Sequence, residues 1–344
     1  MDARNRLLSP RDIFKIYCRK WLRLAPVYYS MWLVVWSMTS RLTEGPLWWF
    51  AQMNTATCDG NWIPTVFMAG NLYNPGNMDP YAGCYQMAWP LQLDMQIALY
   101  IPFLAMIMWW SQSVGCIICV IMILAEVVIN MLLTKHYELT IGLVDAGNYF
   151  LLQAIISKPW TKLANVGAAG ICACIYNNLL RYRLQGDQAQ YPRVHAFKNN
   201  KKAGLVLAGV SFGVIAICLA LAWGPNIDPE SASPLVNQLY FGLTRPLFVI
   251  AVGGILMSIL FGHLDMLRIA MSGSNVRLIG RSLIVASIVQ VLVIEVLFCG
   301  KAMPQGLYLT LPVGVAALGG FVLVVIFLSV VIMMVFEFPM IRIQ

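Results

Sequence analysis

The chain has 344 residues, of which 60% are hydrophobic and only 11% are charged, and its formal net charge is +8. Soluble domains carry about 25% charged residues, so this composition excludes an ordinary soluble protein and indicates a polytopic membrane protein. The basic residues concentrate in alternate loops rather than on one soluble face, which argues against nucleic-acid binding. The nine cysteines include no pair at zinc-like spacing backed by histidines, so no metal site is predicted.

The first 23 residues are strongly basic, and apolar and basic side chains alternate at helical spacing from Ile13 to Arg23. A helix of this kind lies on an anionic membrane leaflet. We therefore expect a basic interfacial segment at residues 1–23, followed by a transmembrane bundle at residues 24–344. An organelle-targeting role for this start is the alternative, which Asp2 and Asp12 weaken.

About eight apolar stretches follow, each near the 20 residues that an α-helix needs to cross a bilayer. The predicted fold is therefore an all-α integral membrane protein. The expected spans are Leu24–Ser40, Leu91–Trp110, Val114–Leu133, Ala164–Leu180, Ala203–Trp223, Leu239–Gly262, Leu278–Cys299 and Leu309–Phe336.

The charge distribution gives these spans an orientation. With the N-terminus inside, most of the 23 Lys and Arg residues fall in inner segments. Cytoplasmic loops of membrane proteins show this excess of positive charge. We expect both termini on the inner side, and residues 181–202 to form a solvated basic inner loop near anionic headgroups.

The segment at residues 41–90 is the longest expected outer loop, and its length and its tryptophans, among them Trp48, Trp49 and Trp62, indicate that it is folded. Its two cysteines are Cys58 and Cys84. If the outer face is oxidising, they should form a disulfide. In a reducing compartment they would instead remain free thiols.

The order of several short motifs resembles the membrane acyltransferase type 3 family, in particular its nose-resistant-to-fluoxetine branch. The resemblance covers nearly the whole chain, and its most specific part is the run from Cys84 through Trp89 to Asp94-Met95-Gln96. The other matching motifs are Arg19, Arg23 and Pro26; Cys58, Asn61-Trp62 and Asn71; Lys158-Pro159-Trp160-Thr161-Lys162; Thr244-Arg245-Pro246; and Phe336-Glu337-Phe338-Pro339.

Two differences from the family pattern bear on activity. The family pattern has ten helices, and one of the first two carries a functional histidine. By this resemblance, the chain begins after both of those helices. A family run of Tyr-Leu-Val-His corresponds here to Ile284–Gln290, which has no histidine. The resemblance therefore implies a truncated member that has lost its chemistry.

The three histidines of the chain, His136, His195 and His263, offer no replacement for that base. Acyl transfer to a hydroxyl needs a general base within reach of the acceptor. All three fall in or beside loops rather than within spans, so we interpret them as interfacial polar residues and expect no catalytic residue.

Charged and polar residues within the spans have two interpretations. Such groups are costly when they face lipid, so they should face the bundle interior. They are either the remnant of a polar acyl-transfer tunnel or internal hydrogen bonds that fix helix packing. The residues are Asp94, Gln96, Glu126, Arg245 and Glu295.

We expect a non-catalytic structural subunit of a larger membrane complex, with other membrane subunits and bound lipids as partners and no cofactor. The mitochondrial inner membrane or the endomembrane system is the expected location. The alternatives are an O-acyltransferase that a separate chain completes, using a donor such as acyl-CoA, and a small-molecule or lipid transporter.

Overall fold

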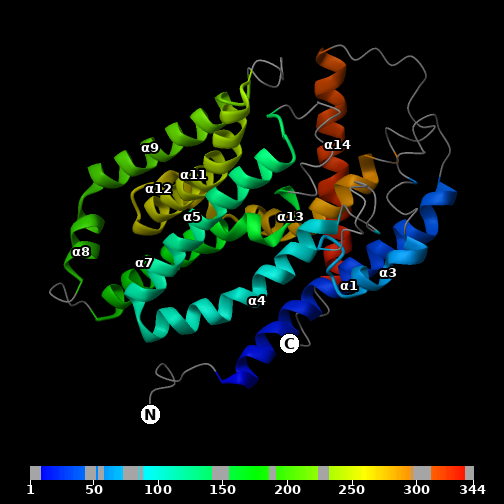
Figure 1. Ribbon diagram of the computed structural model, residues 1–344. Coiled ribbons are helices and arrows are strands. Elements are labelled where there is room, and N and C mark those ends of the chain that lie inside the picture. Colours follow the sequence, from blue (N-terminus) through cyan, green and yellow to red (C-terminus); the bar gives the residue numbers. More distant parts are fainter. Residues whose placement is uncertain are drawn as a thin grey trace. The chain divides into compact units, whose positions relative to one another are not determined.

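The computed structural model describes residues 9–42, 52, 58–72, 84, 88–141, 155–185, 191–223, 232–294, 296 and 311–337. These residues are predominantly helical, and there is no strand among them (Figure 1). The chain divides into two compact units, which are described in turn. The first contains Leu99–Gly273, and the second contains Ser9–Ala98 and Ser274–Gln344.

Within the described ranges, six helices are long and apolar enough to cross a membrane. They cover Trp89–Trp110, Gln112–His136, Pro159–Leu184, Lys201–Ala220, Pro234–Phe261 and Ala317–Val335. The pair Ser274–Leu283 and Val285–Ile294, bent by 55°, makes a seventh if it is one broken span. The prediction of an all-helical integral membrane protein is confirmed, whereas the predicted count of about eight is not reached.

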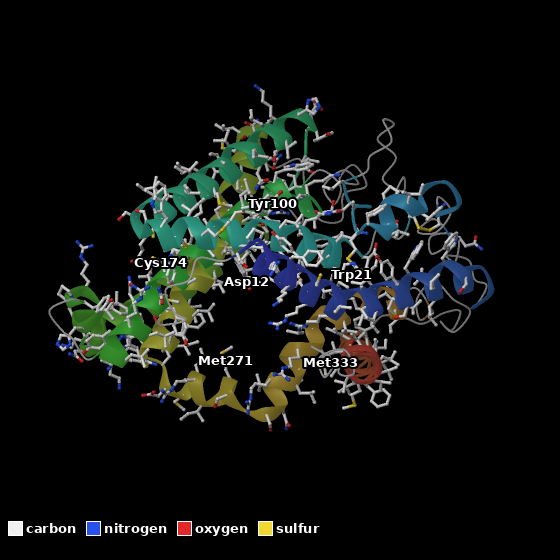
Figure 2. The ribbon with its side chains drawn as sticks, turned by 90° about the horizontal axis from the view of Figure 1, so that it is seen from below. Asp12, Trp21, Tyr100, Cys174, Met271 and Met333 are labelled. Carbon is white, nitrogen blue, oxygen red and sulfur yellow. A yellow bond between two sulfur atoms is a disulfide. The ribbon has the colours of Figure 1, made fainter. Side chains whose placement is uncertain are left out.

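Helix α1 (Pro10–Leu42) accounts for the difference in count. It contains the predicted span Leu24–Ser40, but it is less apolar than the six helices named above. Tyr, Trp and Ser side chains stand in this span where those helices have more aliphatic residues. The expected boundary at residue 23 falls inside this continuous helix. Ser9 and Asp12 cap its start, with Ser9 N donating to Asp12 Oδ2 at 3.0 Å (Figure 2 labels Asp12).

The first unit packs its long helices through small residues. It comprises the end of α4 (Trp89–Trp110), α5 (Gln112–His136), the 3₁₀ turn η5 (Pro159–Lys162), α7 (Leu163–Gln185), α8 (Pro192–Asn199), α9 (Lys201–Ala220), α11 (Pro234–Phe261) and α12 (Asp265–Ser272). Helix α5 packs against α7 and α11, and α11 packs against α9. Gly167 lies directly against the Cys119 carbonyl, and Gly254 against Ser211. Small residues at these positions let helix backbones approach closely, as is typical of helix packing in membranes.

The second unit is built around the inner face of α1. It comprises α1, α3 (Cys58–Val66), the start of α4 (Trp89–Trp110), α13 (Ser274–Ile294), α14 (Leu311–Ile332) and the π-helical turn η8 (Met333–Glu337). Its core includes Tyr28, Trp32, Leu91, Ile288 and Met333. The predicted disulfide between Cys58 and Cys84 is present, with an S–S distance of 2.07 Å.

Candidate functional site

In the second unit, polar residues at the start of α4 form hydrogen bonds within the chain. Gln92, which is fully buried, donates to the Tyr28 hydroxyl at 2.8 Å and accepts from the Asn71 backbone N–H at 2.8 Å. Gln96 donates to the Met68 carbonyl at 3.0 Å and bonds the Asn71 side-chain amide at 2.6 Å. These bonds attach α4 to α1 and to the turn after α3.

Asp94 lies between these two glutamines in sequence and forms an ion pair instead. Its Oδ2 lies 2.6 Å from the Lys20 Nζ on α1, and the two side chains are 35% and 28% exposed. An opposite charge offsets the cost of placing a carboxylate in an apolar helix. Asp94 therefore also connects α1 to α4.

In the first unit, Glu126 lies near the middle of α5 and is 1% exposed. Its Oε2 accepts a hydrogen bond of 2.5 Å from the backbone N–H of Ala164. Ala164 is in the first turn of α7, where N–H groups have no partner within their own helix and carry partial positive charge. The carboxylate thus satisfies one of these N–H groups.

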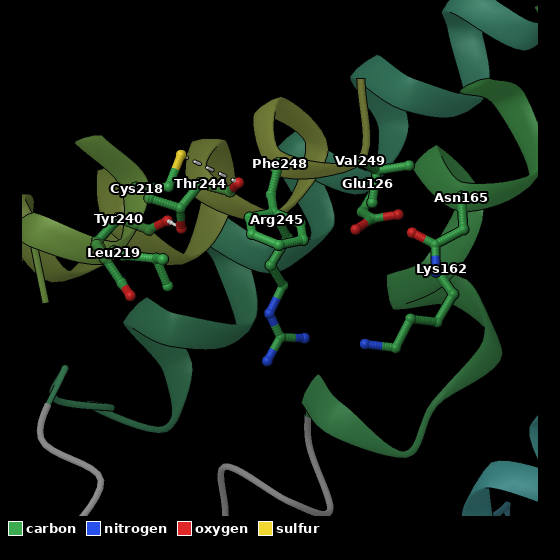
Figure 3. Close-up of a pocket in the computed structure, with 10 residues that line it drawn as sticks. All are labelled: Glu126, Lys162, Asn165, Cys218, Leu219, Tyr240, Thr244, Arg245, Phe248 and Val249. Carbon is green, nitrogen blue, oxygen red and sulfur yellow. Dashed lines mark hydrogen bonds between the residues drawn. The ribbon is translucent and has the colours of Figure 1, made fainter. Parts of the chain in front are cut away.

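Two cations lie close to Glu126 and line a cavity of about 380 Å³ with it (Figure 3). Arg245 comes from α11 and Lys162 from the turn that precedes α7. Both interact electrostatically with Glu126 and with each other. Figure 3 shows the Lys162 ammonium directed toward the Arg245 guanidinium, with Asn165 beside Lys162. Two positive charges and one negative charge leave this cavity with an excess of one positive charge.

The Lys158–Lys162 motif explains how Lys162 is placed. Pro159 begins the 3₁₀ turn, and the buried Thr161 hydroxyl bonds the carbonyls of Ile155, at 2.5 Å, and Lys158, at 2.8 Å. The Lys158 ammonium lies 5.8 Å from the centre of the Trp160 ring, and burial lowers its pKa. This closed turn directs the next side chain, Lys162, into the cavity.

The Thr244-Arg245-Pro246 motif lies inside α11. The Thr244 hydroxyl donates to the Tyr240 carbonyl, and Pro246 has no N–H to continue the helical hydrogen bonds. The Arg245 Nη1 donates to the Ile155 carbonyl at 3.4 Å. Two motifs far apart in sequence therefore meet at Ile155.

The three histidines lie elsewhere within the described ranges. His195 Nδ1 is 2.7 Å from the Tyr182 hydroxyl, and His263 is buried with its ring against Phe197 and Phe261. His136 is exposed at the end of α5, beside Tyr137. None of them lines the cavity around Glu126.

The structure brings together only part of the predicted tunnel set. Glu126 and Arg245 share a cavity in the first unit, whereas Asp94 and Gln96 belong to a separate polar cluster in the second. Glu295 lies outside the described residues. Lys162 was predicted only as the end of the Lys-Pro-Trp-Thr-Lys motif and not as a member of the tunnel set. Its position directly before a span was the signal that could have included it.

Comparisons with protein-family models, curated proteins and solved structures found no match. The resemblance to acyltransferase type 3 proteins therefore rests on the motifs named above and remains a prediction. The fold and its buried polar groups define a helical integral membrane protein with a cationic cavity among its long helices.

Proposed function

We propose that the protein is a non-catalytic, acyltransferase-3-like membrane protein that serves as a structural subunit of a larger membrane complex. The mitochondrial inner membrane is one proposed location, and the endomembrane system is the other. Other membrane subunits and lipids would be its partners, and no cofactor is required.

One observation carries this proposal: the polar side chains of the best-matched motif form contacts within the chain. Gln92, Asp94 and Gln96 each have a partner in α1 or in the segment after α3. A polar group that lines a working tunnel would need free hydrogen-bonding capacity directed at a substrate. Polar groups bonded to other helices instead fix how those helices pack.

The positions of the histidines also support this proposal. A general base must lie within hydrogen-bond reach of the hydroxyl that it activates, either directly or through one water. His263 is enclosed by Phe197 and Phe261, and His195 is held by Tyr182 outside the cavity. The carboxylate of Glu126 is the one acid among the cavity-lining residues, and it already accepts the Ala164 N–H.

A turnover assay on the protein purified in mild detergent tests the absence of catalysis. We expect no transfer of radiolabelled acyl groups from acyl-CoA to lipid or sterol hydroxyls above the rate of heat-denatured protein. Transfer that is abolished in Asp94→Asn but retained in Lys135→Gln would overturn the proposal, because it would place chemistry at the inherited motif.

The cationic cavity favours a second candidate, an acyltransferase completed by a separate chain. Arg245 and Lys162 could hold an anionic acyl donor, but the general base would have to come from that other chain. Co-expression with the chains that co-purify would then restore acyl transfer, and the purified protein alone would not show it.

A further inference from the structure

Counted over the residues that the structure describes, the cavity at Glu126 has one positive charge in excess inside a membrane-spanning unit. Arg245 and Lys162 contribute two positive charges and Glu126 one negative charge. The Lys162 ammonium has no hydrogen bond to a described residue, while Arg245 has one long bond of 3.4 Å to a carbonyl. An unpaired cation is costly inside a membrane, so the cavity is complementary to one negative charge.

An apolar groove adjoins the cavity. A groove of about 480 Å³ between α7 and α11 shares Asn165 and Val249 with the cationic cavity. From these two residues it extends to Tyr176 on α7 and to Leu260 on α11. Eleven residues of helix correspond to about 16 Å, which is a large part of an extended acyl chain.

A second apolar groove, of about 560 Å³, shares Ala168, Cys172, Gly253 and Met257 with the first. Its lining comes from α5, α7, α9 and α11, and is apolar apart from the hydroxyl of Ser211. The first unit therefore contains a charged pocket and two apolar grooves that adjoin one another through shared lining residues.

We propose that this composite site binds an acidic glycerophospholipid. The phosphate lies between Arg245 and Lys162, and an acyl chain follows the α7–α11 groove from Asn165 and Val249. A phosphodiester carries one negative charge and neutralises the excess charge of the cavity. Arg and Lys side chains are also the preferred phosphate ligands of proteins.

The volumes favour a phospholipid over a simpler anion. The charged cavity alone lies within the range of about 300–1,000 Å³ that is typical of small-molecule sites, which is larger than one carboxylate needs. A free phosphate ion would leave the apolar groove unfilled. This inference does not depend on whether the protein is a structural subunit.

Native mass spectrometry of the full chain, with added synthetic lipids, tests the site. We expect phosphatidylglycerol to bind at least tenfold more tightly than phosphatidylcholine with the same chains. Lys162→Gln should remove this preference, since its ammonium bonds no described residue and the substitution should leave the fold intact. Lys135→Gln, the same charge change at the exposed end of α5, should retain it.

Further measurements test the apolar groove and the phosphate site separately. Ala169→Phe, which fills the apolar groove, should weaken phosphatidylglycerol binding, and inorganic phosphate should not compete with the lipid. Each variant must unfold at the same temperature as the wild type. If Lys162→Gln does not, Lys162→Arg takes its place; it keeps the positive charge and should retain the preference for phosphatidylglycerol. Equal binding of both lipids, an unchanged preference in Lys162→Gln, or competition by palmitate at equal concentration would overturn the proposal.

Discussion

Glu126 and Ala164 are joined by a hydrogen bond of 2.5 Å between a buried carboxylate on α5 and a backbone N–H in the first turn of α7. The bond connects segments 38 residues apart and faces a cavity that also contains Arg245 and Lys162. The bond therefore holds α5 against α7, and the Glu126 carboxylate adds a negative charge to the cavity.

Glu126→Ala should destabilise the protein, because the Ala164 N–H would be left buried without a partner. Such a loss costs about 1–3 kcal/mol. Glu126→Gln keeps an acceptor oxygen and should cost less. Chemical unfolding in detergent micelles measures the difference, with the lipid-facing Val128→Ala on the same helix as control. Equal stability of the Ala and Gln variants would show that the bond contributes nothing.

Gln92 and Tyr28 should be energetically coupled. Tyr28 donates to the Thr65 carbonyl at 2.9 Å and accepts from Gln92, so Tyr28→Phe removes both bonds and keeps the ring. In a double-mutant cycle with Gln92→Leu, we expect a coupling energy of about 0.5–3 kcal/mol. Strict additivity of the two substitutions would contradict the proposed polar network.

The Cys58–Cys84 disulfide should stabilise the second unit by about 3 kcal/mol, since it links cysteines separated by 26 positions. Dithiothreitol should therefore lower the Tm of the wild type and leave the Tm of the double Cys→Ser variant unchanged. Cys18→Ser, at a free cysteine, should respond to reductant as the wild type does. The same shift with reductant in the double variant would exclude this bond as the cause.

Gly167→Ala should separate α5 from α7. A Cβ at this position would overlap the Cys119 backbone carbonyl, which cannot move without displacing α5. We expect a loss of about 1–3 kcal/mol, as for other overpacked positions. Gly209→Ala on α9 is the matched control, because a Cβ there meets no atom within 4 Å and should be neutral or slightly stabilising. Similar losses in both variants would argue against the close approach.

Tags at the two termini test whether α1 spans the membrane. If α1 and the bent pair in α13 both cross, the number of crossings is even and both tags lie on the same side. If α1 lies in the interface, the tags lie on opposite sides. Protease protection in sealed vesicles distinguishes these outcomes. We expect both tags inside, because the most basic segments are the ones that we predict to be inner.

Several parts of this structure could be predicted from the sequence. Long apolar runs predicted the helical membrane fold, and two cysteines in one long segment, predicted to be an outer loop, predicted the disulfide. Aromatic and serine residues in α1 made the number of spans harder to predict, because they lower hydropathy where Tyr28 and Trp32 are in fact buried against other helices.

The candidate site could be predicted only in part. The cost of an intramembrane charge identified Glu126 and Arg245, but residue type cannot show which helices face each other. Lys162 joins the cavity because the Thr161 hydroxyl closes a turn onto Ile155, and Arg245 bonds the same carbonyl. Such convergence depends on tertiary packing, which spacing along the chain does not encode.

The most direct test of the proposed function is the composition of the particle that contains this chain in its own membrane. The chain should be affinity-purified in a mild detergent, and its partners should be identified and counted by mass spectrometry. We expect a stoichiometric assembly with several other membrane proteins, in which the chain remains after the tag is moved to a partner. Recovery of a lone chain that transfers acyl groups would contradict a structural role.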